Sequence, residues 1–125
     1  MRRSPLRTKR KPPLPPEIRA HFARVRALGC AVTGSHVQVT LHHPHSGSMA
    51  ELGYGRQKWK SSDWLVIPLR IELHSMGPEA IDGAKGVLSW EADYGKQVDH
   101  VDEVCRRLRE NLWLKAGIDR QVEGL

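Results

Sequence analysis

Three histidines fall within four positions of the chain, His42, His43 and His45, directly after a stretch that reads as a β-strand. A fourth, His74, follows a strongly apolar run and a predicted short helix. Imidazole is the commonest side-chain ligand for transition metals and the commonest general base near neutral pH. The fold is therefore expected to bring the end of this strand and the short helix to one point. The pattern predicts a metal-dependent enzyme.

The length and the cysteine content limit the class of protein. A chain of 125 residues supports one domain with a core of modest size. No apolar run approaches the roughly 20 residues needed to cross a bilayer, and the basic N-terminus lacks the apolar stretch of a signal peptide. We therefore expect a soluble, cytoplasmic protein. Cys30 and Cys105 offer neither a disulfide framework nor a paired-cysteine zinc site, and we expect both to be buried as small apolar residues.

The positive charge is confined to one end of the chain. Residues 1–16 contain no acidic residue and hold six cations, which account for the whole formal charge of +6. The other 14 lysines and arginines are balanced by 14 acidic residues. Five prolines in the same segment predict a disordered or extended tail, which would bind nucleic acid with an affinity that falls as salt rises. The six cations are Arg2, Arg3, Arg7, Lys9, Arg10 and Lys11.

The first half of the chain is predicted to contain a helix and a hairpin. Apolar residues at helical spacing indicate a helix over residues 17–28, which Gly29 ends. Residues 30–33 read as a short strand, and Gly34 and Ser35 supply the turn into a second strand over residues 36–42. A long loop, residues 44–62, follows, and loops of this length are usually functional. Its cations Arg56, Lys58 and Lys60 flank Trp59, a composition that suits nucleic-acid contact, although a tryptophan packed on the core explains it equally well.

The second half is predicted to be mainly helical. Residues 64–69 are apolar, with Pro68 expected to interrupt any regular strand ladder. Helices are expected over residues 69–76, 87–94 and 97–115, and residues 119–125 are expected to be loose. The longest helix carries the clearest core pattern. Its apolar stripe consists of Val98, Val101, Val104, Cys105, Leu108 and Leu112, with Arg106, Arg107 and Arg109 off the stripe.

The histidines suit the hydrolysis of a phosphodiester bond. This reaction needs a deprotonated water, neutralised charge on the phosphate oxygens and a stabilised leaving oxygen. One divalent cation can meet the last two needs if the protein leaves it an open coordination position. A histidine beside that cation can meet the first.

The order of these motifs resembles the HNH, or ββα-metal, endonucleases, and more narrowly the small phage proteins of the RecA-dependent, recombination-enhancement type. The resemblance covers residues 30–83. It rests on Cys30-Ala31-Val32-Thr33-Gly34 near the hairpin, His43 near the strand end, Lys60-Ser61-Ser62-Asp63 before the apolar run, His74 on the short helix and Asp82 several residues later.

The resemblance implies a role for each matching residue. His43 would be the general base, and Asp63 would orient it or brace the loop. His42, His74 and Asp82 would hold one divalent metal, Mg²⁺ or Mn²⁺, with Zn²⁺ or nickel as alternatives. The partners it implies are DNA and a recombinase, in the cytoplasm of a bacterial host.

The chain departs from the family pattern in three respects. Asp63 stands where the motif often has Asn, the paired cysteines of many relatives are missing, and Asp82 lies further from the short helix than usual. His45 could therefore replace His42 as a ligand, and Glu72 could contribute. His21, His36 and His100 have no clustered partners and are expected to be structural or solvated.

These observations lead to one architecture and one preferred function. We expect an α+β fold with a ββα-metal core in residues 17–118, flanked by an N-terminal helix and C-terminal helices. The expected function is a metal-dependent DNA endonuclease that acts in recombination or DNA processing. The alternatives are a non-catalytic nucleic-acid-binding module on the same scaffold, and an accessory protein whose tail binds an acidic protein surface.

Overall fold

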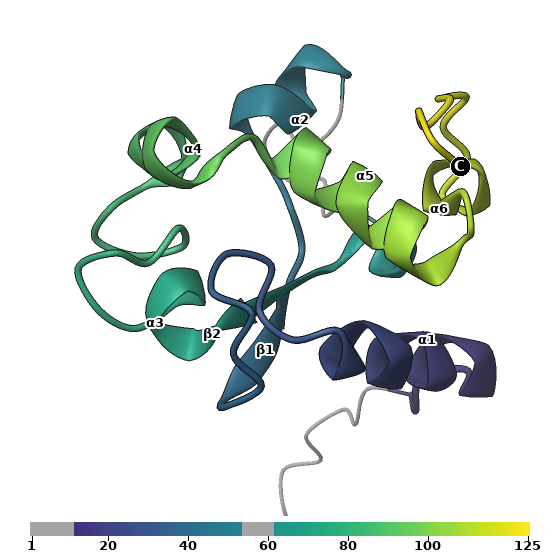
Figure 1. Ribbon diagram of the computed structural model, residues 1–125, viewed down its shortest axis with the longest axis horizontal. Helices are drawn as coiled ribbons and strands as arrows, with labels where there is room; N and C mark the ends of the chain where they lie inside the picture. Colours follow the sequence, from purple (N-terminus) through teal and green to yellow (C-terminus); the bar gives the residue numbers. More distant parts are fainter. Residues whose placement is uncertain (1–11, 54–61) are drawn as a thin grey trace, which may run out of the picture.

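The protein combines helices with a small two-stranded antiparallel sheet, an α+β fold (Figure 1). The computed structural model describes residues 12–53 and 62–125. The helices are α1 (Pro16–Ala27), α2 (Gly47–Glu51), α3 (Ile71–His74), α4 (Val87–Tyr94), α5 (Gln97–Leu108) and α6 (Leu112–Lys115), with the 3₁₀ turn η1 (Asp63–Leu65) and the strands β1 (Val39–His42) and β2 (Ile67–Arg70). No helix in these two ranges is both long and apolar enough to span a bilayer.

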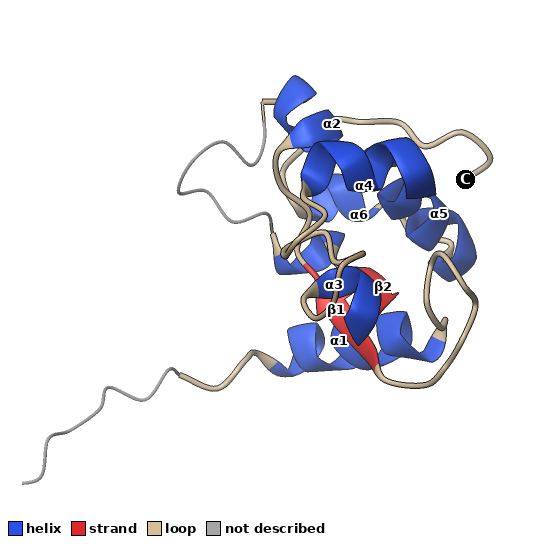
Figure 2. Cartoon of the chain, turned by 90° about the vertical axis from the view of Figure 1, so that its left-hand side faces the viewer, coloured by secondary structure: helices blue, strands red, loops and turns tan. Residues whose placement is uncertain are grey.

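The sheet joins two strands that lie 24 residues apart in the chain. β1 and β2 pair antiparallel, with Val39 opposite Arg70 and His42 opposite Ile67. Helix α3 begins at the residue that follows β2 and packs against both strands. Figure 2 shows the strands in red, with α1 beneath them. The polypeptide therefore runs strand, strand, short helix, and the end of β1 lies beside this helix.

The predicted hairpin between residues 30–33 and 36–42 is wrong. Residues 30–36 form a turn, in which Gly34 N–H donates to the Cys30 carbonyl and Cys30 N–H donates to the Ser35 carbonyl, both at 2.8 Å. β1 pairs instead with β2, whose Ile67 and Leu69 are fully buried. Burial of this apolar strand contributes more stability than a local hairpin would, because hydrophobic burial scales with the apolar area removed from water.

Pro68 lies within the ladder and does not interrupt it. It sits opposite Leu41 in the register. Its carbonyl accepts a hydrogen bond of 2.8 Å from Ala31 N–H, so the 30–36 turn lies along the other side of β2. Proline is tolerated here because a strand of a two-stranded sheet has one edge on which no ladder donor is needed.

The predicted long helix over residues 97–115 is two helices. Arg109 adopts a left-handed conformation with φ 56° and ends α5. The Asn111 side chain then accepts a hydrogen bond from Trp113 N–H and begins α6. This break buries Leu112 and Trp113 completely. A straight continuation of α5 would not place both side chains on its apolar stripe.

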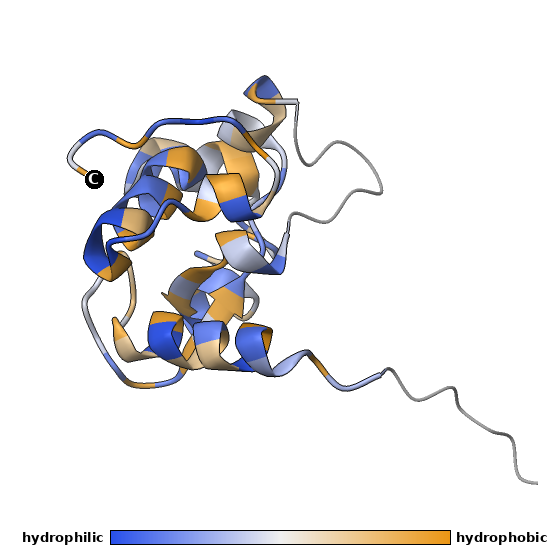
Figure 3. Cartoon of the chain, turned by 90° about the vertical axis from the view of Figure 1, so that its right-hand side faces the viewer, coloured by the Kyte–Doolittle hydropathy of each residue, from blue (hydrophilic) through white to orange (hydrophobic). Residues whose placement is uncertain are grey.

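The core is otherwise as predicted. The apolar stripe of α5 packs inside, with Val101 and Cys105 fully buried and Leu108 partly buried against the same cluster. Both cysteines are free and buried. Figure 3 shows apolar and polar positions alternating along the helices, as expected for helices with one buried face.

Residues 119–125, expected to be loose, contact the body of the protein. Val122 is 7% exposed. Arg120 forms an ion pair of 2.8 Å with Asp102 of α5, and its carbonyl accepts a hydrogen bond from Asn111. The remaining differences from the predicted elements are small. α1, α3 and α4 lie within the expected segments to within one or two residues, and the 44–62 segment contains the short helix α2.

Candidate metal centre

Local hydrogen bonds bring the predicted ligands to one point. His42 is the last residue of β1 and His74 the last of α3. After α3 the chain turns back along it, because Ile81 N–H donates to the Leu73 carbonyl and Asp82 N–H to the His74 carbonyl, both at 2.9 Å. Ile81 is buried and anchors this return. Asp82 is therefore placed next to His74, in spite of the seven residues that separate them.

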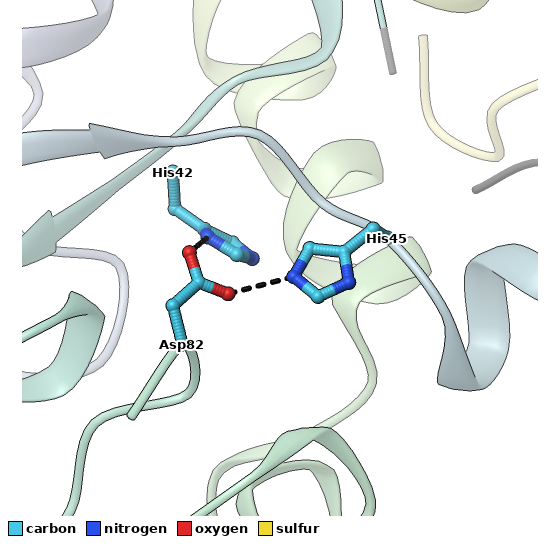
Figure 4. Close-up of side chains that lie close together, drawn as sticks. All are labelled: His42, His45 and Asp82. Carbon is cyan, nitrogen blue, oxygen red and sulfur yellow. Dashed lines mark hydrogen bonds and ion pairs between the residues drawn. The ribbon is translucent and has the colours of Figure 1, made fainter. Parts of the chain in front are cut away.

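The Asp82 carboxylate contacts three imidazoles. Its Oδ1 lies 2.6 Å from His45 Nε2, and its Oδ2 lies 3.3 Å from both His42 Nδ1 and His74 Nε2. Figure 4 shows His42 and His45 approaching the carboxylate from the same stretch of chain. One ligand atom each from His42, His45 and Asp82 lie within 4.8 Å of one another, so these three residues could hold a metal ion.

The hydrogen bonds of His42 leave an unpaired nitrogen facing the carboxylate. Its Nε2 lies 2.8 Å from Gln97 Oε1, which can only accept, so Nε2 carries the proton. Nδ1 is then a lone-pair acceptor, buried and without a hydrogen-bond partner in the described part of the chain. Two acceptors, this nitrogen and a carboxylate oxygen, face each other at 3.3 Å. That arrangement is unfavourable unless a cation or a proton lies between them.

His74 is held in the same way by Thr40. The Thr40 hydroxyl donates to the Leu69 carbonyl at 2.9 Å, so toward His74 Nδ1, 2.8 Å away, it acts as an acceptor. Nδ1 therefore carries the proton, and the Nε2 lone pair faces Asp82. In metal-binding histidines, the ring nitrogen that does not bind the metal commonly donates its N–H to an oxygen, and this hydrogen bond fixes the tautomer. The residues present thus fit a metal ion.

The cluster is open on one side. The His42 side chain is fully buried and that of His74 is 19% exposed, whereas those of His45 and Asp82 are 38% and 32% exposed. Burial acts to raise the pKa of Asp82, but contacts with imidazoles that hold a proton toward the carboxylate outweigh it, so the net shift is downward. The hydrogen bond to Asp82 raises the pKa of His45 against the opposing effect of burial. The cluster therefore favours an ionised carboxylate with access from solvent.

His43, the residue after His42 in the chain, forms a second pair with Asp63. His43 Nε2 lies 2.8 Å from Asp63 Oδ1, and both side chains are more than a third exposed. Asp63 opens η1, which Ser62 caps by accepting a hydrogen bond from Trp64 N–H. The Phe22 ring of α1 packs against the His43 imidazole in a T-shaped arrangement, with ring centroids 6.3 Å apart. The imidazole is thus oriented from both sides.

The structure brings His42, His74 and Asp82 together as predicted, and pairs His43 with Asp63. His45 joins His42 in the cluster and does not replace it. Glu72 instead forms an ion pair with Arg70. The predicted nucleic-acid contacts Arg2, Arg3, Arg7, Lys9, Arg10, Lys11, Arg56, Lys58 and Lys60 lie outside the described residues.

Two supporting residues, Thr40 and Gln97, were not predicted from the sequence. The position of Thr40 could have indicated its role, because it precedes His42 by two positions and so lies on the same face of the strand. No sequence feature indicated a role for Gln97, since it lies 52 residues beyond His45 and begins a helix. Comparisons of the chain with protein-family models, with curated proteins and with solved structures gave no match.

Proposed function

We propose that the protein is a metal-dependent DNA endonuclease with a ββα-metal core. The observation that carries the proposal is the meeting of His42, His45, His74 and Asp82 at the end of β1, with the His43–Asp63 pair directly after the strand. The order of two antiparallel strands and a short helix agrees with the arrangement of the HNH endonucleases that the sequence motifs resemble.

The donor set bears on the metal. Mg²⁺ prefers oxygen ligands, whereas imidazole nitrogens suit zinc and other transition ions. Three imidazoles and one carboxylate therefore favour Zn²⁺ or Mn²⁺ over Mg²⁺. When bound, such an ion would neutralise charge on the phosphate oxygens and stabilise the departing oxygen.

The proton transfer falls to His43. Because the Asp63 carboxylate accepts from Nε2–H, the unprotonated nitrogen of His43 is Nδ1. Nδ1 would take the proton from the attacking water, and Asp63 would stabilise the imidazolium that forms. The exposure of both side chains leaves room for a DNA backbone to approach.

The test is the nicking of supercoiled plasmid in Mn²⁺, Zn²⁺, Mg²⁺ or chelator. We expect wild-type protein to nick with the transition ions, and His43→Ala to nick about 10²–10⁴-fold more slowly, the usual contribution of a general base. The His43→Ala protein should keep its zinc affinity and its thermal midpoint. His36→Ala is the matched control, because His36 is an exposed histidine with no place in the cluster.

Two outcomes would count against the proposal. Nicking by His43→Ala at the wild-type rate would exclude His43 as the base. Binding of DNA without cleavage in any of the three ions would indicate a non-catalytic nucleic-acid-binding module on the same scaffold.

A further inference from the structure

Gln97, the first residue of α5, joins two residues of the metal centre through one side-chain amide. Its Nε2 donates to the His45 carbonyl at 2.8 Å, and its Oε1 accepts from His45 N–H at 3.1 Å. This pair of bonds to one backbone fixes which end of the amide carries the oxygen. The same Oε1 accepts from His42 Nε2 at 2.8 Å. Gln97 is fully buried, so water does not compete for these bonds.

The orientation of the amide decides which nitrogen of His42 faces the metal position. With Oε1 held toward His42, a proton on Nε2 makes a hydrogen bond. A proton on Nδ1 would instead leave two buried acceptors, Nε2 and Oε1, facing each other, at a cost comparable to a lost hydrogen bond. Nδ1 is therefore left unprotonated and directed at Asp82 Oδ2. The choice of ligand atom is made by the protein before any ion arrives.

Glu91 of α4 holds Gln97 in place. Its Oε2 accepts from Gln97 N–H at 2.8 Å, and its carboxylate also accepts from the backbone and the hydroxyl of Ser48 in α2. The Ser48 hydroxyl in turn accepts from Val98 N–H at 3.2 Å. A carboxylate at the first turn of a helix satisfies N–H groups that have no partner within the helix. A Cβ at Gly47 would collide with this carboxylate, so the packing here requires glycine.

We infer that Gln97 is a positioning residue of the metal centre: it sets the tautomer of His42 so that Nδ1 is the ligand atom, and it ties the backbone of His45 to the same point. This inference depends on the metal centre of the proposed function and not on nuclease activity. It accounts for a buried amide whose hydrogen bonds go to His42, His45 and Glu91.

The test compares Gln97→Met with Gln121→Met, a matched exchange at an exposed glutamine. The Kd for Zn²⁺ is measured by competition with a chromophoric chelator. The His42 tautomer in the zinc-free protein is read from long-range ¹H–¹⁵N NMR spectra of the imidazole. Because Gln97→Met removes buried hydrogen bonds, thermal unfolding is recorded first, and both measurements are made where each protein is folded.

We expect Gln97→Met to raise the Kd for Zn²⁺ about 10–100-fold, the usual effect of removing a group that orients a metal ligand. The His42 proton should then occupy Nδ1 in a substantial fraction of molecules. Gln121→Met should leave both readouts unchanged. Gln97→Glu retains an acceptor oxygen toward His42 and should keep the proton on Nε2, which supplies the test if Gln97→Met does not fold.

Three results would overturn the inference. One is that folded Gln97→Met binds Zn²⁺ with the wild-type Kd and keeps the His42 proton on Nε2. Another is a shift of the proton to Nδ1 in Gln97→Glu. Failure of folded wild-type protein to bind zinc would overturn both this inference and the proposed function, whereas zinc binding without DNA cleavage would overturn only the nuclease proposal.

Discussion

In the candidate metal centre, the hydrogen-bond partner of one ring nitrogen decides which nitrogen of the same imidazole is left unprotonated. Gln97 leaves His42 Nδ1 free, and Thr40 leaves His74 Nε2 free. Asp63 in the same way leaves His43 Nδ1 unprotonated, and this is the atom that takes the proton in the proposed reaction. The residue type alone does not distinguish these histidines, and their neighbours suit some of them to the proposed role of metal ligand and His43 to the proposed role of base. His21 is a contrasting case, because its environment makes it structural.

His21 is expected to make stability depend on pH. Its Nε2 donates to the Trp64 carbonyl at 3.0 Å, and its Nδ1 is buried without a partner among the described residues. Burial lowers the pKa of His21 against the effect of that bond. The unfolded chain therefore takes up the proton first as pH falls below about 6.5. The native state loses stability from this group there, by at most about 1.4 kcal/mol per pH unit, and none of this loss occurs above that pH.

The measurement is urea denaturation of wild type and His21→Gln at pH 7.5 and pH 5.5. Glutamine can donate the same hydrogen bond to Trp64 but does not titrate. The stability difference between the two proteins should therefore narrow at pH 5.5, while the other histidines contribute equally to both. A constant or widening difference would show that His21 accepts a proton in the folded state.

Which residues form the site was largely predictable, and what holds them was not. The family resemblance pointed to His42, His74 and Asp82, and the structure places these three side chains together. The role of His45 was left open, because strand alternation ceases at Pro44 and no periodicity governs the turn that follows. Gln97 and Glu91 act through contacts between distant elements, and neither residue type in isolation indicates such a role.

The C-terminal segment is expected to stabilise the pair of helices α5 and α6. Asp102 of α5 has a side chain only 11% exposed and accepts from Trp113 Nε1 and Arg120 Nη2, each at 2.8 Å. Arg120→Met keeps an aliphatic side chain near the Trp113 ring but removes the partner of Asp102 Oδ2. A hydrogen bond to a charged group contributes about 1.5–3 kcal/mol. Since Arg120 is 30% exposed, we expect a loss of about 1–2 kcal/mol.

The check is the free energy of unfolding in urea, with Arg107→Met as control. Arg107 lies exposed on α5, and its substitution should change stability by no more than about 0.5 kcal/mol. Equal effects of the two substitutions would mean that the ion pair of Arg120 with Asp102 contributes nothing to stability.

Among the helices and strands, those that depend on contacts with distant segments were not predicted from the local sequence pattern. The periodicities of α1 and α4 were sufficient because the spacing of a helix's buried face is contained within its own segment. The strand partner of β1 was predicted wrongly because a hairpin with residues 30–33 is closer in sequence than β2, and only burial of β2 favours the distant pairing. The end of α5 was missed because Arg109 adopts a left-handed conformation that is usual for Gly or Asn.

In the whole molecule, the excess positive charge and the proposed site of reaction lie in different parts of the chain. The proposed ligands and base lie in the part of the chain that carries no net charge, and the whole excess of +6 lies in residues 1–11. DNA affinity and metal affinity should therefore be separable by changes to different parts of the chain. In the proposed endonuclease, residues 1–11 would provide most of the DNA affinity, and the histidines and Asp82 would carry out the reaction.

Deletion of residues 2–11 is expected to weaken DNA binding and to reduce its salt dependence, while the Kd for Zn²⁺ stays unchanged. Each phosphate neutralised by a cation adds about 0.9 to the slope of log K against log salt, so removal of six cations should lower its magnitude by up to about 5. The slope is measured by fluorescence anisotropy of a labelled duplex at salt concentrations between about 50 and 200 mM, a range over which a protein with about 6–10 phosphate contacts loses about 10³–10⁵-fold in DNA affinity.

A chain with these residues in scrambled order should behave like wild type, because backbone neutralisation carries no sequence information. An unchanged slope in the deletion would place the DNA contacts on the folded body, where the balanced charges would have to be arranged as a cationic face.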